Sequence, residues 1–389
     1  MLISVKNQVH SQINIDWRRK MNKSVILTSP LRTMVPIIKV VGDYCNLRCR
    51  YCFYNARDQS VRCVMSDELL EKFIKDYMEL FSGNLKFIWH GGEPLLAGMS
   101  FLRKIVYLQA KYLTSKQTIQ NVIQTNATLI NSEWARFFKT NNFKVGGSID
   151  GAKRSHNHFR LHKKGFGSFN AAVRGIKILE NNNIHPGFIQ TLTKSNIENA
   201  QEDFYFFSEI LKAKSWGINH YLDIQQVNKK MLGQSIDCVD LTNFLKVYID
   251  FWLTQDRPDI RIREIENFFA GVLNKQSSNC TFSGSCTGYF TVEYNGKVFP
   301  CDRLSTDEKF LFGDLSTQSL LEVLNGSKRI EYAQSVNTPH ADCINCEWHN
   351  ACHNGCSANR IGGIQGKYFY CESRKVIFAY LKEKIQKYK

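Results

Sequence analysis

The 389-residue sequence has no run of eighteen apolar residues, which a membrane-spanning helix would need. Its first residues also lack the apolar stretch of a secretion signal, so we expect a soluble, cytoplasmic protein that does not bind membranes. No internal repeat or low-complexity tract is evident. Hydrophobic residues make up 43% of the chain, which is enough for a packed core. The length predicts one large domain or two of ordinary size.

Acidic residues are outnumbered by basic ones, and the formal net charge is +16. A basic chain can indicate nucleic-acid binding, but the lysines and arginines are spread along this one, with a local cluster at 160–164. An acidic peptide partner accounts for this charge as well as RNA does.

Thirteen cysteines are the most informative feature of the composition. A secreted disulfide scaffold would be shorter and would carry an export signal. In a reducing compartment, cysteines at short spacings more often bind metal, so we expect metal sites.

Short β-branched or aromatic runs alternate with segments of helical period from residue 35 onward. Strands are predicted at 35–41, 85–90, 121–127, 143–149, 186–193 and 221–227. Helices are predicted at 66–82, where Ser66 is a plausible N-cap, and near 101–113, 132–141, 168–182, 198–213 and 240–254. Six strand–helix units predict an α/β fold with a parallel sheet, which a partial (β/α)6 TIM-like barrel would satisfy.

The alternation stops near residue 275, where cysteines become dense. We therefore predict an N-terminal extension at 1–34, a core domain at 35–275 and a cysteine-rich domain at 276–389. Within the last domain, 289–301 is expected to be a hairpin with Asn295-Gly296 at its turn, and 372–387 a terminal helix.

Three cysteines follow the first predicted strand in the spacing Cys45-x3-Cys49-x2-Cys52. A cubane [4Fe–4S] cluster takes one protein ligand per iron, so three cysteines leave one iron open for chemistry. The alternatives are a zinc site or three incidental thiols. Several motifs of polar residues and glycines follow the next strands at their C-terminal ends, which form the active-site rim in barrels of this kind.

The segments DYCNLRCRYCFY and WHGGEP together resemble the radical S-adenosylmethionine (SAM) superfamily. The resemblance implies that the three cysteines hold a cluster that cleaves SAM to a 5′-deoxyadenosyl radical. It also implies that SAM is bound by glycine backbone and by polar side chains. The cofactor-binding candidates are Tyr51, Gly91, Gly92, Glu93, Asn126, Ser148, Asp150 and Arg160.

Eight further cysteines fall in two arrays between residues 280 and 371. Their layout resembles the SPASM extension of peptide-modifying radical enzymes, which carries two fully ligated auxiliary [4Fe–4S] clusters. The resemblance assigns Cys280, Cys286, Cys301 and Cys356 to the nearer cluster. It assigns Cys343, Cys346, Cys352 and Cys371 to the farther one. Structural zinc is the alternative, and Cys63 and Cys238 are left over as ordinary thiols.

A net oxidation follows from counting electrons. Once a hydrogen atom leaves a substrate carbon, a closed-shell product requires the loss of one more electron and one proton. An auxiliary cluster can take the electron, and a nearby side chain must take the proton. Asp302, directly after Cys301, is the candidate, because an aspartate follows this cysteine in sulfatase-maturating enzymes. A salt bridge to Arg303 or a turn cap is the alternative role.

The substrate is expected to be a precursor peptide or protein, and a flavodoxin or ferredoxin is the expected electron donor. Ala127 and the segments at 301–304, 312–320 and 352–360 favour a ribosomal-peptide maturase that forms three-residue cyclophanes. The alternative is an anaerobic sulfatase-maturating enzyme that oxidises Cys or Ser to formylglycine. An RNA-modifying radical enzyme and a non-catalytic metal-binding scaffold are the alternatives from other classes.

Overall fold

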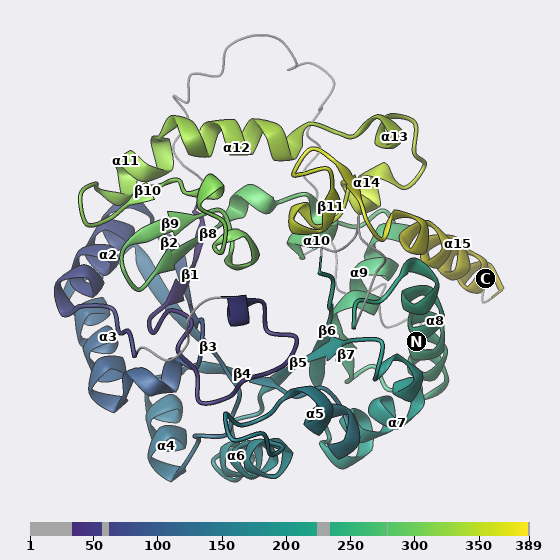
Figure 1. Ribbon diagram of the computed structural model, residues 1–389, viewed down its shortest axis with the longest axis horizontal. Helices are drawn as coiled ribbons and strands as arrows, with labels where there is room; N and C mark the ends of the chain where they lie inside the picture. The colour runs from purple at the N-terminus through teal and green to yellow at the C-terminus, as the bar shows by residue number, and fades with distance from the viewer. Residues whose placement is uncertain (1–32, 57–61, 224–233, 278, 388–389) are drawn as a thin grey trace.

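The computed structural model describes residues 33–56, 62–223, 234–277 and 279–387. One ten-stranded sheet lies at its centre, in the order β10-β9-β8-β1-β2-β3-β4-β5-β6-β7, and a second sheet pairs β11 with β12 (Figure 1). The main sheet comprises β1 (Val35–Lys39), β2 (Gly83–His90), β3 (Gln117–Thr125), β4 (Lys144–Ser148), β5 (Gly187–Leu192), β6 (Ser215–His220), β7 (Arg261–Ile262), β8 (Tyr289–Glu293), β9 (Lys297–Phe299) and β10 (Gly313–Asp314). The small sheet comprises β11 (Arg360–Ile361) and β12 (Lys367–Tyr368).

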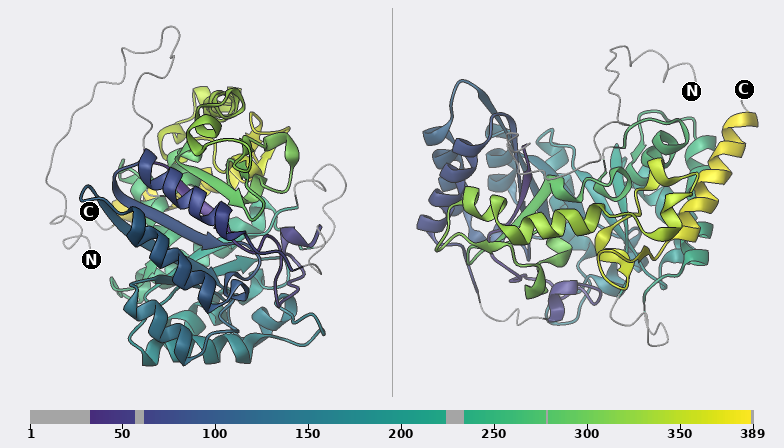
Figure 2. Two further views of the ribbon diagram at one scale, coloured as in Figure 1. Left: turned by 90° about the vertical axis from the view of Figure 1, so that its left-hand side faces the viewer. Right: turned by 90° about the horizontal axis from the view of Figure 1, so that it is seen from above.

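Helices surround the strands on the outside of the curved sheet (Figure 1). The helices of the first two thirds of the chain are α2 (Asp67–Leu80), α3 (Met99–Tyr112), α4 (Ser132–Thr140), α5 (Lys153–Phe159), α6 (Phe169–Asn181), α7 (Ala200–Tyr205), α8 (Cys238–Thr254) and α9 (Arg263–Val272). Those of the cysteine-rich part are α10 (Cys280–Ser283), α11 (Leu320–Asn325), α12 (Ser327–Asn337), α13 (Ala341–Ile344), α14 (His349–Cys352) and α15 (Cys371–Lys387). Helix α15, the last helix of the chain, packs against α8 and α9 (Figure 2).

The apolar periodicity of the sequence builds this layered arrangement. In β2, Leu85, Phe87 and Trp89 alternate with more exposed residues, and all three are buried. In α2, the buried residues Phe73 and Tyr77 lie one turn apart on the same helix face. The Phe87 ring meets the Tyr77 ring edge-on with centroids 4.9 Å apart, so helix and sheet share one core.

The predicted α/β class with a parallel sheet is confirmed, because β1 to β7 pair in parallel throughout. The strand predicted at 221–227 is wrong. The sixth strand is Ser215–His220, which pairs with β5 through Trp216 and Ile218, and residues 221–223 lie beyond its end. The remaining residues of that prediction, 224–227, lie outside the described residues.

The strand β8 joins the cysteine-rich part to the barrel by pairing in parallel with β1 over five residues. The hairpin of β8 and β9 turns at Asn295-Gly296, and Gly296 adopts a positive φ of 92° there. The sheet is therefore continuous across residue 275. The 1–34 extension lies outside the described residues except for its last two. In the part of the chain that the structure describes, no helix is long and apolar enough to cross a membrane.

The N-terminus of α2 provides a test of the helix assignment. The Ser66 hydroxyl accepts a hydrogen bond from the Leu69 backbone N–H at 3.2 Å. We expect Ser66→Ala to lower the free energy of unfolding by about 1 kcal/mol, because that N–H loses its partner. Chemical denaturation measures the change. Ser316→Ala, at an exposed serine in a loop, is the control and should change stability by less than about 0.5 kcal/mol; equal effects would contradict the capping role.

Candidate active site

The loop after β1 carries Cys45, Cys49 and Cys52, all partly buried. Hydrogen bonds hold its backbone against the segment after α5: Arg48 N–H donates to the Leu161 carbonyl at 2.7 Å, and Arg50 N–H to that of Phe159 at 3.0 Å. The three thiols are thus presented together at the C-terminal ends of the strands.

The electrostatics of these thiols fit a metal-cluster site. Burial raises the pKa of Cys45, and the Glu93 carboxylate raises it further. Burial and the neighbouring Cys49 raise the pKa of Cys52 to about 12. Such thiols would stay protonated at neutral pH, and a positively charged cluster core is what stabilises their thiolate forms.

Gly91 and Gly92 let the loop after β2 lie directly on the cysteine loop. A Cβ at Gly92 would be 2.0 Å from the Tyr44 carbonyl oxygen, and one at Gly91 would be 2.5 Å from Lys39 Cγ. Both glycines have positive φ angles. The Glu93 N–H then donates to the Tyr44 carbonyl at 2.9 Å. The glycine pair is therefore required by the fold itself, in addition to any contact with SAM.

Glu93 is fully buried and ties the loop after β2 to the end of β3. Its carboxylate accepts hydrogen bonds from the Thr125 hydroxyl and the Asn126 N–H, both at 2.8 Å. Burial raises its pKa to about 7, and these hydrogen bonds oppose the increase. Both carboxylate oxygens have protein partners, so Glu93 holds the loop after β2 against the end of β3.

Asn126 lies against the first cysteine. Its amide nitrogen is 3.7 Å from Cys45 Sγ and 2.8 Å from Asn46 Oδ1. Its own oxygen accepts from the Thr128 hydroxyl at 2.7 Å. The side-chain amide of Asn126 thus contacts the cluster loop directly.

Three of the SAM-binding candidates form one buried group beside Cys49. The Tyr51 hydroxyl donates to Asp150 Oδ2 at 2.7 Å, and Arg160 Nε lies 3.0 Å from the same oxygen. The positive charge of Arg160 opposes the increase that burial causes in the pKa of Cys49. Ser148 lies on the end of β4 and accepts a hydrogen bond from Gln124 at 3.0 Å.

Asp302 lies on the other side of the cysteine loop, at the end of the β8–β9 hairpin. Its carboxylate accepts a hydrogen bond from the Tyr54 hydroxyl and lies 3.7 Å from His90 Nδ1. Among the described residues, its ion-pair partner is His90 and not Arg303. The carboxylate is thus directed toward residues that follow β1 and end β2.

The buried ammonium group of Lys39 lies over the ring of Tyr54. Lys39 Nζ lies 4.0 Å from the centre of the Tyr54 ring and 2.8 Å from both Asp43 and Glu293. Sequence reasoning did not identify Tyr54, His90 or Lys39. Tyr54 and His90 lie within the segments DYCNLRCRYCFY and WHGGEP, two residues after Cys52 and directly before Gly91. Their closeness to these residues was the only sequence feature that pointed to the site.

Four of the eight cysteines between residues 280 and 371 lie close together beside the β8–β9 hairpin: Cys280, Cys286, Cys301 and Cys356. The pKa of Cys280 is raised to about 12 by burial and by the nearby Cys356 and Cys286. Burial raises the pKa of the partly exposed Cys301, and the same two cysteines raise it further. The structure thus brings together the set that the resemblance assigned to the nearer auxiliary cluster.

The other set lies between α13, α14 and the start of α15. Burial and the charges of Cys352 and Cys346 raise the pKa of Cys343, and the pKa of Cys371 is raised to about 11 by burial. Cys352 contributes a smaller increase at Cys371. Within the described ranges, no three Cys, His, Asp or Glu side chains converge closely enough to hold a single metal ion. The cluster assignment therefore rests on the sets of thiols.

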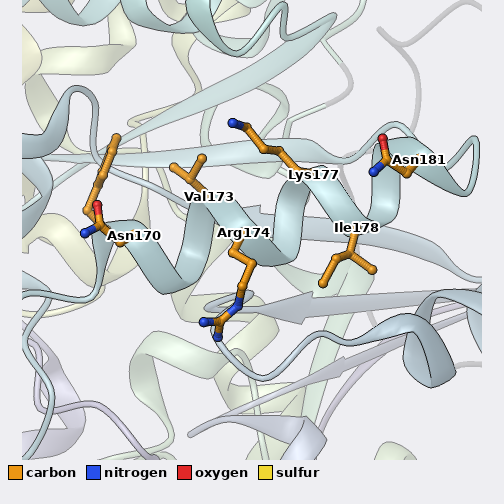
Figure 3. A pocket seen from close by; sticks show the side chains of 7 residues that line it. Asn170, Val173, Arg174, Lys177, Ile178 and Asn181 are labelled. Carbon is orange, nitrogen blue, oxygen red and sulfur yellow. The ribbon is translucent and has the colours of Figure 1, made fainter.

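Two remaining features lie apart from these sets. Cys238 begins α8 and its thiol contacts the Phe369 carbonyl at 3.2 Å. A cavity of about 320 Å³ runs along the outer side of α6, lined by residues such as Val173, Arg174 and Ile178 (Figure 3). It contains no cysteine or carboxylate and is not the candidate site.

Substitution of Gly92 tests the packing of the two loops. We expect Gly92→Ala to reduce stability by about 1–3 kcal/mol relative to Gly98→Ala, and to lower iron incorporation. The reason is that the added Cβ meets the Tyr44 carbonyl, whereas Gly98 has a positive φ but open space. Thermal unfolding and iron analysis measure both variants; matching losses would contradict the steric account.

Comparisons with known proteins agree with this geometry. A model of the radical SAM superfamily matches residues 40–204, and a model of the iron–sulfur cluster-binding SPASM domain matches 280–347. The cysteine-type anaerobic sulfatase-maturating enzyme of Clostridium perfringens is 31% identical over 88% of this chain and 95% of its own length. The serine-type enzyme of Bacteroides thetaiotaomicron is also 31% identical, over 88% of this chain and 87% of its own.

Solved structures give the same result. The structure of native anSMEcpe with bound AdoMet has a TM-score of 0.84 and 30% identity, and the match covers 91% of this chain and 98% of that one. Streptococcus suis SuiB bound to S-adenosylmethionine shares the fold, with a TM-score of 0.61 and 15% identity. SAM and iron–sulfur clusters are therefore the cofactors, and the chain belongs to the radical SAM/SPASM maturase family that includes the anaerobic sulfatase-maturating enzymes.

Proposed function

We propose that this enzyme oxidises a cysteine or serine side chain of a peptide or protein substrate to formylglycine. The observation that carries the proposal is near-full-length similarity to relatives named for sulfatase maturation, of both the cysteine and the serine type. The cyclophane-forming reaction, favoured by the sequence details, is not supported by these relatives. The alternative reaction fits them better.

The residues that would hold the cofactors follow from the site. Cys45, Cys49 and Cys52 would hold the catalytic cluster, and the two sets of four cysteines the auxiliary clusters. Asn126 and Arg160 are the candidates best placed to meet SAM, because the Asn126 amide lies 3.7 Å from Cys45 Sγ and the Arg160 charge opposes the increase that burial causes in the pKa of Cys49. When bound, these cofactors supply a hydrogen-abstracting radical and a sink for the second electron.

Asp302 would take the proton. Oxidation removes a hydrogen atom from the substrate Cβ, then one electron from the carbon and one proton from the hydroxyl or thiol. Serine yields the aldehyde directly, whereas cysteine yields a thioaldehyde that water converts to the aldehyde with release of hydrogen sulfide. The Asp302 carboxylate is 15% exposed and contacts both Tyr54 and His90, so it is partly accessible and is held in one orientation.

The product itself can be tested directly. The reconstituted enzyme, SAM and a reductant are incubated without oxygen with matched peptides that carry Cys or Ser in a sulfatase motif. We expect an aldehyde at that residue, detected by hydrazide labelling and mass spectrometry. Loss of two hydrogens from an aromatic-containing peptide without an aldehyde would indicate a crosslink and contradict the proposal.

Substitution of Asp302 tests its role. We expect Asp302→Asn to retain SAM cleavage while lowering product formation by about 100-fold, because an amide cannot accept the proton. Tyr54→Phe removes the hydroxyl that donates a hydrogen bond to the Asp302 carboxylate, and it should lower product formation by a smaller factor. Liquid chromatography of 5′-deoxyadenosine and of the peptide measures both quantities. Full product formation by Asp302→Asn would remove the residue from the mechanism.

A further inference from the structure

We propose that an acidic electron-transfer protein docks on a basic face beside Cys49. This basic face consists of Arg48, Arg50, Lys163 and Lys164, and the same two segments carry the exposed rings of Phe53 and Phe166. The proposal rests on the radical chemistry proposed above, in which the catalytic cluster must be reduced by one electron before SAM is cleaved.

The four cations of the basic face come from two segments that are locked together. Arg48 and Arg50 flank Cys49 in the cysteine loop, and Lys163 and Lys164 lie in the loop after α5. All four are exposed. The backbone of the first segment bonds to Leu161 and Phe159, and a bridge joins Leu47 to His162. The cations are therefore held near one another by backbone contacts.

Negative charge is missing from both segments. Residues 151–179 contain no aspartate or glutamate, and neither do residues 44–57. Among the described carboxylates that border these segments, Asp43 pairs with Lys39 and Asp150 pairs with Arg160, while Asp58 lies outside the described residues. A face with four exposed cations attracts a partner of opposite charge and speeds its encounter.

Exposed aromatic rings make the basic face more than a solvated surface. Phe53, directly after Cys52, is 42% exposed, and Phe166 is 56% exposed. The Phe166 ring lies 4.4 Å from that of His162, so it is supported from one side. Arginine and aromatic residues are the types enriched where proteins meet.

The position of the basic face favours a redox protein over the substrate. Cys49 lies between Arg48 and Arg50, so a partner that touches both is one residue from a proposed cluster ligand. The substrate must instead reach Asp302, which follows β9. In the sheet, β8 and β4 lie on opposite sides of β1, so the hairpin that precedes Asp302 and the loop after α5 flank the cysteine loop from different sides. An electron can therefore enter without displacing the substrate.

The partner is expected to be a small acidic protein that carries a flavin hydroquinone. A flavin hydroquinone would give up one electron and one proton and become the semiquinone. The catalytic cluster would gain that electron. No other reactant is needed for this step.

Charge reversal tests the proposal. The double variant Lys163→Glu/Lys164→Glu reverses two cations that lie outside the cysteine loop. The matched control is Arg136→Glu/Lys139→Glu, which reverses two exposed cations on α4. Reconstituted enzymes are compared for binding of an acidic flavodoxin by interferometry at low and high salt. SAM cleavage without peptide is measured with reduced flavodoxin and with reduced methyl viologen, a small cation.

We expect the first variant to bind flavodoxin about tenfold more weakly at low salt and to cleave SAM about tenfold more slowly with it. Cleavage with methyl viologen and the behaviour of the control should match the wild type. Unchanged flavodoxin binding would overturn the proposal. Equal losses with both reductants would also overturn it and would assign the face to the peptide or to folding. Because no peptide is present, failure of the formylglycine proposal would not affect this outcome.

Discussion

The parallel pairing of β8 with β1 is the contact on which the active site depends. It aligns Glu293 with Lys39 across the two strands, and the buried ammonium group meets that carboxylate and Asp43 at 2.8 Å each. A buried lysine without such partners would be strongly destabilising, so the pairing and the ion contacts require each other. The hairpin that begins with β8 then delivers Cys301 and Asp302 to the cysteine loop.

On the other side of the cysteine loop, a buried carboxylate likewise holds several residues in place. Asp150 receives the Tyr51 hydroxyl, the Arg160 guanidinium and the Thr191 N–H, and it is fully buried. A carboxylate with three partners holds its neighbours in fixed orientations. The two sides of the cysteine loop therefore differ in chemistry: one presents Asp302 with two residues that can share a proton, and the other presents a cation beside Cys49.

The sequence was sufficient for the class of fold, because alternating strands and helices leave strong local patterns, whereas the division of the thiols into sets came from the family resemblance and not from their spacing. Alternating apolar residues in β2 and helical spacing in α2 predicted their elements to within a few residues. The sixth strand was missed because Ser215–His220 contains Gly217 and Asn219, which weaken a β pattern, while the following segment is richer in it. The environment of Glu93 could not be predicted, since its partners come from a different strand end. The position of Lys39 beside the Tyr54 ring likewise depends on its ion pair with Glu293, which lies 254 residues away along the chain.

The central proposal is that three sets of cysteines form three separate cluster sites, of which only that of Cys45, Cys49 and Cys52 is catalytic. Iron and sulfide analysis with Mössbauer spectroscopy of the reconstituted protein tests it most directly. The account predicts about twelve iron atoms per chain in the wild type, and about eight in the Cys45→Ala/Cys49→Ala/Cys52→Ala variant, as two intact clusters without SAM cleavage. Zinc in place of iron, or loss of all iron from that variant, would contradict it.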